Sequence, residues 1–334
     1  MVENGGSNGG VDAAPHPVRT LSLVTVVFEA EYPLLELQAR SMAAFLSRET
    51  VREIVVIDNS WKPMSDRTRR RILRAYGPHT DRVRFVGHRE IAAVPPSIGW
   101  MRQQILKLEV ARLVSSDAYV VLDAKNHLVA HADFSTFVAA SGRPLGNFHP
   151  YETHPLRTSL ERVLGYVALP TNAYIRRFTA TTTPFVILTN VATELVEAIA
   201  AREGRSFGEV FVSQSFTEFF LYSAWLESSG RPVDEVYDDR GIANVTVWPR
   251  GRDRRRVDAA IDDVDRRSAR FLSIHRTALA RMDSAALASL SGFWVRRGMF
   301  ANRAEVTRFV WLYRARYVRA MVAKKLRERL SARR

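Results

Sequence analysis

The first half of the chain alternates short apolar runs with segments of helical periodicity. Continuous apolar runs at residues 21–28 and 54–57 predict buried strands, and residues 83–86 and 119–122 predict a short third strand and a fourth. Helical patterns separate these runs, at residues 33–46, 67–76 and 97–113. Buried strands that alternate with helices are typical of βαβ units around a parallel sheet. We therefore expect an α/β fold with a mostly parallel sheet.

The second half of the chain is less regular. Residues 141–183 are predicted to form long loops, and residues 185–188 and 245–248 to form strands. Helical patterns cover residues 191–202, 213–227, 266–290 and 303–332, and residues 250–270 are charged. The Gly- and Asn-rich start of the chain predicts disorder. The expected organisation is a disordered segment over 1–18, one domain over 19–250, and a charged linker with a basic helical C-terminal extension over 251–334.

Polar side chains follow three of the predicted strands directly. Glu29 follows the first strand, Asp58 the second, and Asp123 the fourth. In parallel α/β sheets, ligands bind at the carboxyl ends of the strands. These three carboxylates are therefore the first candidates for a site.

The densest group of chemically active side chains lies between residues 99 and 127. Its members are Gln103, Gln104 and Lys107 on a predicted helix, then Asp123, Lys125, Asn126 and His127 after a strand. In extended geometry Asp123, Lys125 and His127 share one face. Such a cluster suits a diphosphate, with Lys as the cation, Asp as a metal ligand, and Asn and Gln for sugar hydroxyls. The alternative is a solvated strand-to-loop junction, where Asp and Asn are common turn residues.

Composition narrows the possible classes of protein. The 334 residues include no Cys, which excludes disulfide scaffolds, iron–sulfur sites and a cysteine nucleophile. No apolar run reaches the roughly 18 residues that span a bilayer, and the N-terminus lacks the features of a signal peptide. No Walker A, GxGxxG, HExxH or GxSxG motif is present. These features lead us to expect a cytoplasmic protein.

The net charge of +14 is concentrated near the C-terminus. Residues 296–334 carry +11, and the rest of the chain carries only +3. Within residues 303–332, apolar side chains recur at helical spacing among arginines: Val306, Val310, Tyr313, Tyr317, Met321 and Leu326. A basic amphipathic helix suits an anionic membrane surface, and a helix packed on the domain is the other interpretation. Specific nucleic-acid binding is disfavoured because the body is near neutral and carries no recognised binding motif.

The order of elements resembles a GT-A nucleotide-sugar glycosyltransferase. More closely, the chain resembles a bacterial family of GT-A-like glycosyltransferases that is classed as a domain of unknown function. The matching stretches are residues 25–41, 54–60, 99–108, 120–129, 183–185, 217–222 and 246–249. The pair QQILKL and LDAKNH is their specific part. The resemblance implies a GT-A-like, Rossmann-like mixed sheet, mostly parallel and flanked by helices, with a helical C-terminal extension.

The resemblance also implies roles at the donor site. Thr25 and Glu29 would contact the base or ribose, and Asp58 the nucleoside. Lys107 would approach the phosphates or the sugar of the donor. A uridine-based donor is expected.

A metal site is implied with one departure from the family pattern. Asp123 holds the first position of the Asp-X-Asp motif that binds Mn²⁺ or Mg²⁺, but Lys125 replaces the second Asp. A protonated lysine supplies positive charge and cannot ligate a metal. His275 lies where several GT-A enzymes bring a C-terminal His back to the metal, although a His between apolar residues also suits a structural role. Weak metal binding, other ligands and no metal all remain open.

Glu218 is the expected catalytic base, and Asp123 the second catalytic residue. Inverting sugar transfer needs a carboxylate that accepts the acceptor hydroxyl's proton, and Glu218 begins a predicted helix beyond the metal motif. The alternative is a carboxylate that only stabilises a helix N-terminus. The expected enzyme is a hexosyltransferase that moves a sugar to a glycan or lipid-linked acceptor in cell-envelope or polysaccharide biosynthesis. It would work in the cytoplasm or peripherally at the inner face of the membrane.

Three rival functions stay open. A nucleotidyltransferase would need a Gly-rich phosphate loop after the first strand, and FEAEYP there contains no Gly. A catalytically inactive GT-A-like module would bind glycan or membrane without turning over a donor. A basic nucleic-acid-associated protein would lose affinity steeply with salt.

Overall fold

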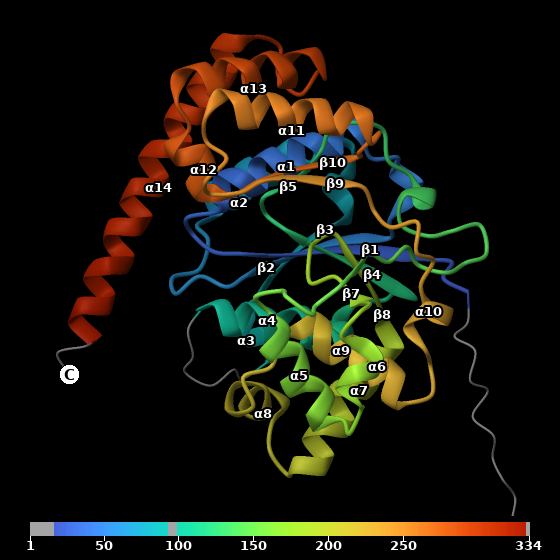
Figure 1. The fold of residues 1–334 in the computed structure, drawn as a ribbon. Helices are drawn as coiled ribbons and strands as arrows, with labels where there is room; N and C mark the ends of the chain where they lie inside the picture. The colour runs from blue at the N-terminus through green and yellow to red at the C-terminus, as the bar shows by residue number, and fades with distance from the viewer. Residues whose placement is uncertain (1–16, 93–98, 332–334) are drawn as a thin grey trace, which may run out of the picture.

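The computed structural model describes residues 17–92 and 99–331. Most of the segment expected to be disordered, residues 1–16, and the predicted helix start at residues 97 and 98 lie outside the described residues. The main layers are a central sheet and helices on both of its faces (Figure 1). The expected mixed, mostly parallel sheet flanked by helices is confirmed.

The central sheet has the strand order β3-β2-β1-β4-β8. Its strands are β1 (Leu21–Val27), β2 (Glu53–Asp58), β3 (Val83–Gly87), β4 (Ala118–Asp123) and β8 (Phe185–Leu188). The first four pair in parallel, and β8 pairs antiparallel to β4. Every residue of β1 is buried, as a continuous apolar strand requires when helices cover both faces of a sheet. The four strands expected in the first half are confirmed.

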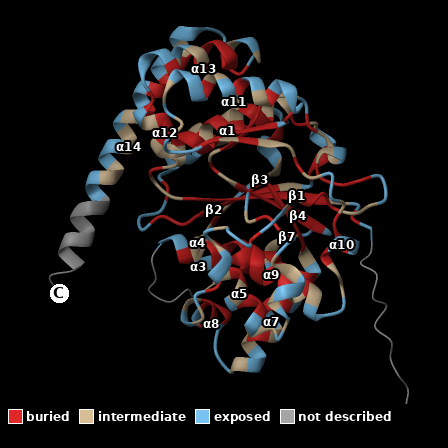
Figure 2. Cartoon of the chain, viewed as in Figure 1, coloured by how far each residue is buried: buried red, intermediate tan, exposed pale blue. Residues whose placement is uncertain are grey.

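Helices cover both faces of this sheet. The helices are α1 (Tyr32–Phe45), α2 (Asp66–Ala75), α3 (His88–Ile91), α4 (Gly99–Glu109), α5 (Arg157–Tyr166), α6 (Thr171–Tyr174), α7 (Thr189–Glu203), α8 (Phe207–Ser213), α9 (Glu218–Ser228), α10 (Val233–Val236), α11 (Arg254–Arg266), α12 (Arg276–Arg281), α13 (Ser284–Arg296) and α14 (Arg303–Ser331). In Figure 1, α1 and α11 lie above the sheet, and α4, α7 and α9 lie below it. Figure 2 shows the buried residues gathered along the sheet and the inner helix faces. No described helix is long and apolar enough to cross a membrane.

Two small sheets complete the fold. One has the order β5-β10-β9, from β5 (Asn126–Leu128), β10 (Phe271–Ile274) and β9 (Asn244–Val247). Its middle strand, β10, is antiparallel to β5 and parallel to β9. The other pairs β6 (Phe148–His149) with β7 (Phe178–Thr179). The first of these sheets joins segments that are far apart in sequence.

Two helical predictions are wrong in detail. The helix expected over 266–290 is interrupted by β10, because the run FLSI is apolar and buried throughout and its periodicity does not distinguish strand from helix. The helix expected over 213–227 begins only at Glu218, as α9, because α8 ends at Ser213 and Ser215 between the two helices takes the left-handed conformation at φ 51°. The loops expected over 141–183 also contain α5.

The expected boundary at residue 250 falls between two strands that belong to one sheet. β9 ends at Val247, and β10 then pairs with β9 and β5. The charged segment that follows residue 250 forms α11, with Val257, Ile261 and Val264 buried. Residues 251–296 therefore belong to the same packed structure as residues 19–250 and add a strand and helices to it.

Candidate active site

A cavity of about 320 Å³ opens where the carboxyl ends of β1 and β4 meet the sheet β5-β10-β9. The chain proceeds from β1 through β2 to β3 in one direction and places β4 on the other side of β1. Ligands bind at such reversals of strand order in open α/β sheets, because the flanking connections diverge there. Glu31 follows β1 and Asp123 ends β4, and both line the cavity.

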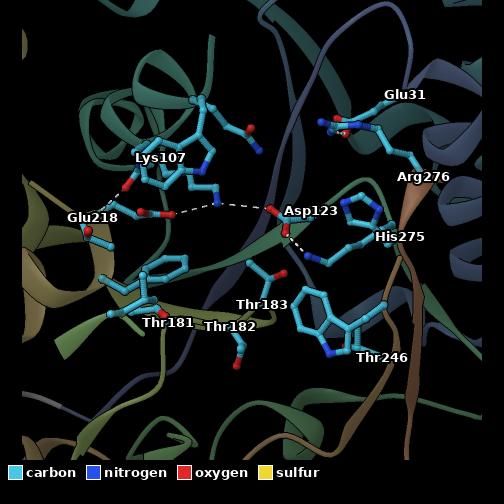
Figure 3. A pocket seen from close by; sticks show the side chains of 18 residues that line it. Glu31, Lys107, Asp123, Thr181, Thr182, Thr183, Glu218, Thr246, His275 and Arg276 are labelled. Carbon is cyan, nitrogen blue, oxygen red and sulfur yellow. Dashed lines mark hydrogen bonds and ion pairs between the residues drawn. The ribbon is translucent and has the colours of Figure 1, made fainter. Parts of the chain in front are cut away.

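Lys107 occupies the centre of the charged group in this cavity. Its Nζ lies 3.2 Å from Asp123 Oδ1 and 3.0 Å from Glu218 Oε1 (Figure 3). Burial opposes the charge on Lys107, but the two carboxylates outweigh that effect and raise its pKa. Lys107 therefore stays an ammonium that links the end of β4 to the start of α9.

Asp123 is bound by two lysines. Lys125 Nζ lies 2.7 Å from Asp123 Oδ2, while Lys107 contacts the other carboxylate oxygen. Burial alone would raise the pKa of Asp123, but both ammonium groups outweigh it and hold that pKa far below its usual range. Each carboxylate oxygen thus already accepts a hydrogen bond from a cation.

The turn after Asp123 is fixed by buried amides. Asn126 Oδ1 accepts from the Asp123 amide N–H at 2.6 Å. Gln38 Nε2 donates to the carbonyl oxygens of Asp123 and Asn126, both at 2.9 Å, and its own oxygen accepts from Thr25 Oγ1 at 2.9 Å. Because these groups are buried, their hydrogen bonds are costly to lose. Thr25, Gln38 and Asn126 therefore hold Asp123 in place from behind the cavity.

Glu218 is the first residue of α9 and lies at the end of the cavity near α4. Its backbone N–H donates to Gln104 Oε1 at 3.3 Å. The next residue, Phe219, stacks on Phe185 of β8 with ring centroids 4.2 Å apart. Lys107 Nζ lies 5.1 Å from the centre of the Phe219 ring. The carboxylate is thus anchored by packing on one side and by an ion pair on the other.

Another part of the cavity wall is formed by His275 and Arg276, which directly follow β10. Arg276 pairs with Glu31 at 2.5 Å, and burial raises the pKa of Glu31 although Arg276 opposes this. His275 Nδ1 accepts from the Thr277 N–H at 3.1 Å. Burial, then the charges of Arg276 and Lys125, lower the pKa of His275 to about 4. The neutral ring therefore carries its proton on Nε2 and acts as a donor at neutral pH.

Aromatic and hydroxyl side chains supply the rest of the lining. Trp100 of α4 and Trp248 after β9 are 60% and 54% exposed, which is unusual for large apolar residues. Lys125 Nζ lies 5.5 Å from the Trp248 ring centre. Three consecutive threonines, Thr181–Thr183, contribute polar atoms beside them (Figure 3). Exposed aromatic faces next to hydroxyls suit a ligand with both apolar faces and hydroxyl groups.

The structure brings together seven of the residues that the sequence indicated. They are Gln103, Gln104, Lys107, Asp123, Lys125, Glu218 and His275. Five others do not line this cavity: Thr25, Glu29, Asp58, Asn126 and His127. Thr25 and Asn126 lie behind it in the hydrogen-bond network around Gln38.

Asp58 and His127 have other surroundings. Asp58 accepts from the backbone N–H groups of Ser60 and Met64 at 3.1 and 2.6 Å, so its carboxylate stabilises its own loop. His127 is buried, and its Nε2 accepts from Trp294 Nε1 at 3.0 Å. The expectation that Asp123, Lys125 and His127 share an extended face is wrong. The chain turns at residues 124–125, and His127 then enters β5.

Other residues that line the cavity were not expected as site residues from the sequence, among them Glu31, Trp100, Thr181–Thr183, Trp248 and Arg276. Glu31 lies two residues after the expected Glu29, and Arg276 directly follows His275. Trp100, Thr183 and Trp248 fall inside the stretches that carry the family resemblance, so only that comparison contained a signal for them.

The donor set does not fit a divalent cation. Within residues 17–92 and 99–331, no three His, Cys, Asp or Glu side chains are grouped so that they could hold a metal ion. Both oxygens of Asp123 already accept from lysines. His275, whose Nδ1 accepts a backbone N–H, presents a protonated Nε2 and not a lone pair. A metal at Asp123 would have to displace at least one ammonium group.

The chain is similar to several solved glycosyltransferase structures. An active-site mutant of LgtC is 14% identical with a TM-score of 0.29, covering 42% of this chain and 51% of its own. The bifunctional glycosyltransferase WbbM is 11% identical with a TM-score of 0.42, covering 78% and 47%. The galactosyltransferase LgtC with donor and acceptor sugar analogues is 10% identical with a TM-score of 0.37, covering 59% and 71%. The chain thus spans about half the length of the first two.

Sequence comparison places the chain in a family. No curated protein matches it significantly. A family model, described as a family of unknown function (DUF6492), matches residues 28–247. That span includes Lys107, Asp123, Lys125 and Glu218 and ends before His275 and Arg276. The match covers most of the chain and confirms the expectation of a family of unknown function: this protein belongs to the DUF6492 family.

Proposed function

We propose that this protein is a glycosyltransferase that moves a sugar from a nucleotide-diphosphate donor to a hydroxyl of a glycan or lipid-linked acceptor. One observation carries the proposal. A cationic and carboxylate cluster, with exposed tryptophans beside it, lines a cavity at the strand-order reversal next to β4. The sequence resemblance to GT-A enzymes at the same residues supports it. A uridine-based donor is the first to test.

The proposed donor diphosphate lies against cations of the chain itself. Lys125 and Arg276 both line the cavity, and the protonated Nε2 of His275, which directly precedes Arg276, is a further donor there. Cations at a departing diphosphate stabilise the charge that develops as the sugar is transferred. This assignment needs no divalent metal, in agreement with the two ammonium groups that already hold Asp123.

Glu218 is the proposed base for the acceptor. Its carboxylate takes the proton of the acceptor hydroxyl as that oxygen bonds to the anomeric carbon. The bond between the anomeric carbon and the diphosphate oxygen breaks, and the diphosphate leaves with the electron pair. Inversion at the anomeric carbon follows from this single displacement. Lys107 holds the Glu218 side chain in place through its 3.0 Å ion pair.

The first experiment measures thermal stability with a panel of nucleoside diphosphates, in EDTA and in Mn²⁺. A ligand that binds only the folded protein adds about 2.7 kcal/mol at a hundred times its dissociation constant. We expect a shift for one nucleotide in EDTA. Lys125→Met should weaken that binding about 10- to 100-fold, since charge-assisted contacts contribute about 1.5–3 kcal/mol. The exposed Lys62→Met is the matched control.

A second variant separates binding from turnover. Glu218→Gln keeps the size of the side chain and removes the base, so donor binding should remain while release of nucleoside diphosphate from the sugar nucleotide falls by about 100-fold or more. Normal turnover in Glu218→Gln would refute the base assignment. Nucleotide binding without turnover in the wild-type protein would favour an inactive binding module.

A further inference from the structure

The long helix α14 has two faces with different surroundings. Its inner face packs on the body through Val306, Val310 and Tyr313, which are buried. On its outer face Trp311, Val318 and Val322 are 67%, 58% and 52% exposed. These three residues are seven and four positions apart, so they form one stripe along the helix. Part of the apolar face that the sequence predicted, at Val306, Val310 and Tyr313, is therefore packed against the body. The stripe of Trp311, Val318 and Val322 is a second apolar face, and it is exposed.

Arginines flank the uncovered stripe. Arg308 and Arg319 are both exposed. Arg308 lies three residues before Trp311, and Arg319 directly follows Val318. Beyond them, α2 contributes exposed Arg67 and Arg70. A groove beside α14 is lined by Glu305, Arg308, Leu312 and Arg316 of α14, by Pro33, Glu36 and Arg40 of α1, and by Arg71 of α2, so one arginine of α2 lies close to α14. Burial and then the charge of Arg71 lower the pKa of Arg316, as expected where positive charges crowd together.

We propose that the outer face of α14 docks on an anionic lipid bilayer, and that the adjacent cavity acts on an acceptor carried by that bilayer. An exposed tryptophan and valines between arginines match an interface that combines acyl chains with anionic headgroups. A nucleic acid would meet the arginines but would leave the apolar stripe unused. A second copy of the chain would bring like charges together at the same face. An anionic bilayer can pair its headgroups with the arginines and cover the apolar stripe with its acyl chains.

The docking helix is joined directly to the cavity. Tyr313 Oη donates to the Arg276 carbonyl oxygen at 2.7 Å, and Arg276 lines the cavity with Glu31. In Figure 1, α14 passes α12 and extends away from the body of the molecule. A bilayer held by α14 would therefore lie beside the cavity. The inference about the acceptor rests on the proposed glycosyltransferase function, whereas the docking itself does not.

The test is sedimentation of the full chain with vesicles of phosphatidylcholine alone and of phosphatidylcholine with 30% phosphatidylglycerol. We expect binding to the anionic vesicles only. Removing two surface arginines with Arg308→Gln/Arg319→Gln should weaken it about 30-fold, at about 1 kcal/mol for each basic residue. The matched control, Arg255→Gln/Arg270→Gln, removes the same charge from exposed positions of α11 and the turn after it, and should bind as the wild type does.

The apolar stripe has its own variant. Trp311→Ser/Val318→Ser/Val322→Ser keeps the net charge and should weaken vesicle binding at least tenfold, with an unchanged melting temperature because the three side chains are exposed. Unchanged vesicle binding in this variant, equal loss in the arginine control, or no binding by the wild type would overturn the docking proposal. Nucleotide binding by the same triple variant should be normal. A failure of docking and a failure of the donor site are therefore seen separately.

Discussion

Lys107 sets the charge balance of the cavity at the scale of single residues. Its ammonium lies within 3.2 Å of both Asp123 and Glu218, and it is only 5% exposed. Without it Asp123 would keep its ion pair with Lys125, but the buried Glu218 would lose the ion pair that its carboxylate makes. Removal of one partner from a buried ion pair is strongly destabilising because the remaining charge keeps its desolvation cost.

We therefore expect Lys107→Met to lower the free energy of unfolding by about 3–5 kcal/mol. Neutralising Glu218 as well, in Lys107→Met/Glu218→Gln, should restore most of that loss, because Asp123 keeps its ion pair with Lys125. Urea unfolding at pH 7 measures both variants. If the double variant were no more stable than the single one, the loss would come from packing around Lys107 and not from unpaired charge.

At the scale of elements, β5 and α13 meet through one buried polar contact. Trp294 of α13 donates to His127 of β5, and burial lowers the pKa of His127 to about 4 from 6.5. Between these two pH values the unfolded chain holds a proton that the folded chain excludes. The free energy of unfolding therefore falls as the pH decreases from 6.5 to 4.

His127→Gln should remove part of this pH dependence. Glutamine keeps an acceptor for Trp294 but does not titrate. The free energy of unfolding should therefore fall between pH 7 and pH 4 by up to about 3 kcal/mol less in the variant than in the wild type. Chemical unfolding at several pH values measures the difference. Parallel pH profiles for the two proteins would show that His127 does not set the acid sensitivity.

The elements also show how far the sequence could be interpreted. Strands β1, β2 and β4 were predictable because each contains a continuous apolar run that is buried on both faces, and β3 was predictable from its short run of β-branched and aromatic residues. The run FLSI at residues 271–274 is also buried, but it holds only one β-branched residue and lies among helical patterns, and its pairing with β5 and β9 makes it a strand. The grouping of Lys107, Asp123 and Glu218 followed from strand ends and family resemblance. Glu31 and Arg276, which are 245 residues apart, had no local signal that they pair.

At the scale of the whole molecule, the part after residue 250 completes the fold. β10 lies between β5 and β9, and Trp294 and Phe300 pack together in the core that α14 covers through Phe309. A chain that ended at the expected boundary would leave both neighbours of β10 unpaired and expose the apolar surface beneath α13. Exposed edges and apolar surface of this kind lead to association.

A chain that ends at residue 250 should therefore lack cooperative thermal unfolding and should aggregate during gel filtration. A chain that ends at residue 323 keeps β10, α13 and the packed part of α14, and should melt within a few degrees of the full chain. Circular dichroism of the two shortened proteins measures this. Cooperative unfolding of the shorter one at the full chain's temperature would support an independent domain over 19–250.

The central place of β10 in its sheet has a consequence for the order of events during synthesis. A growing chain folds from its N-terminal side as it leaves the ribosome. Lys107, Asp123 and Glu218 emerge early, but β5 and β9 can join only when residues 271–274 arrive between them. The wall that carries His275 and Arg276 arrives with the same strand. The nascent protein thus holds Asp123 and Glu218 in an open groove until most of the chain has been made, and the cavity is assembled in one late step.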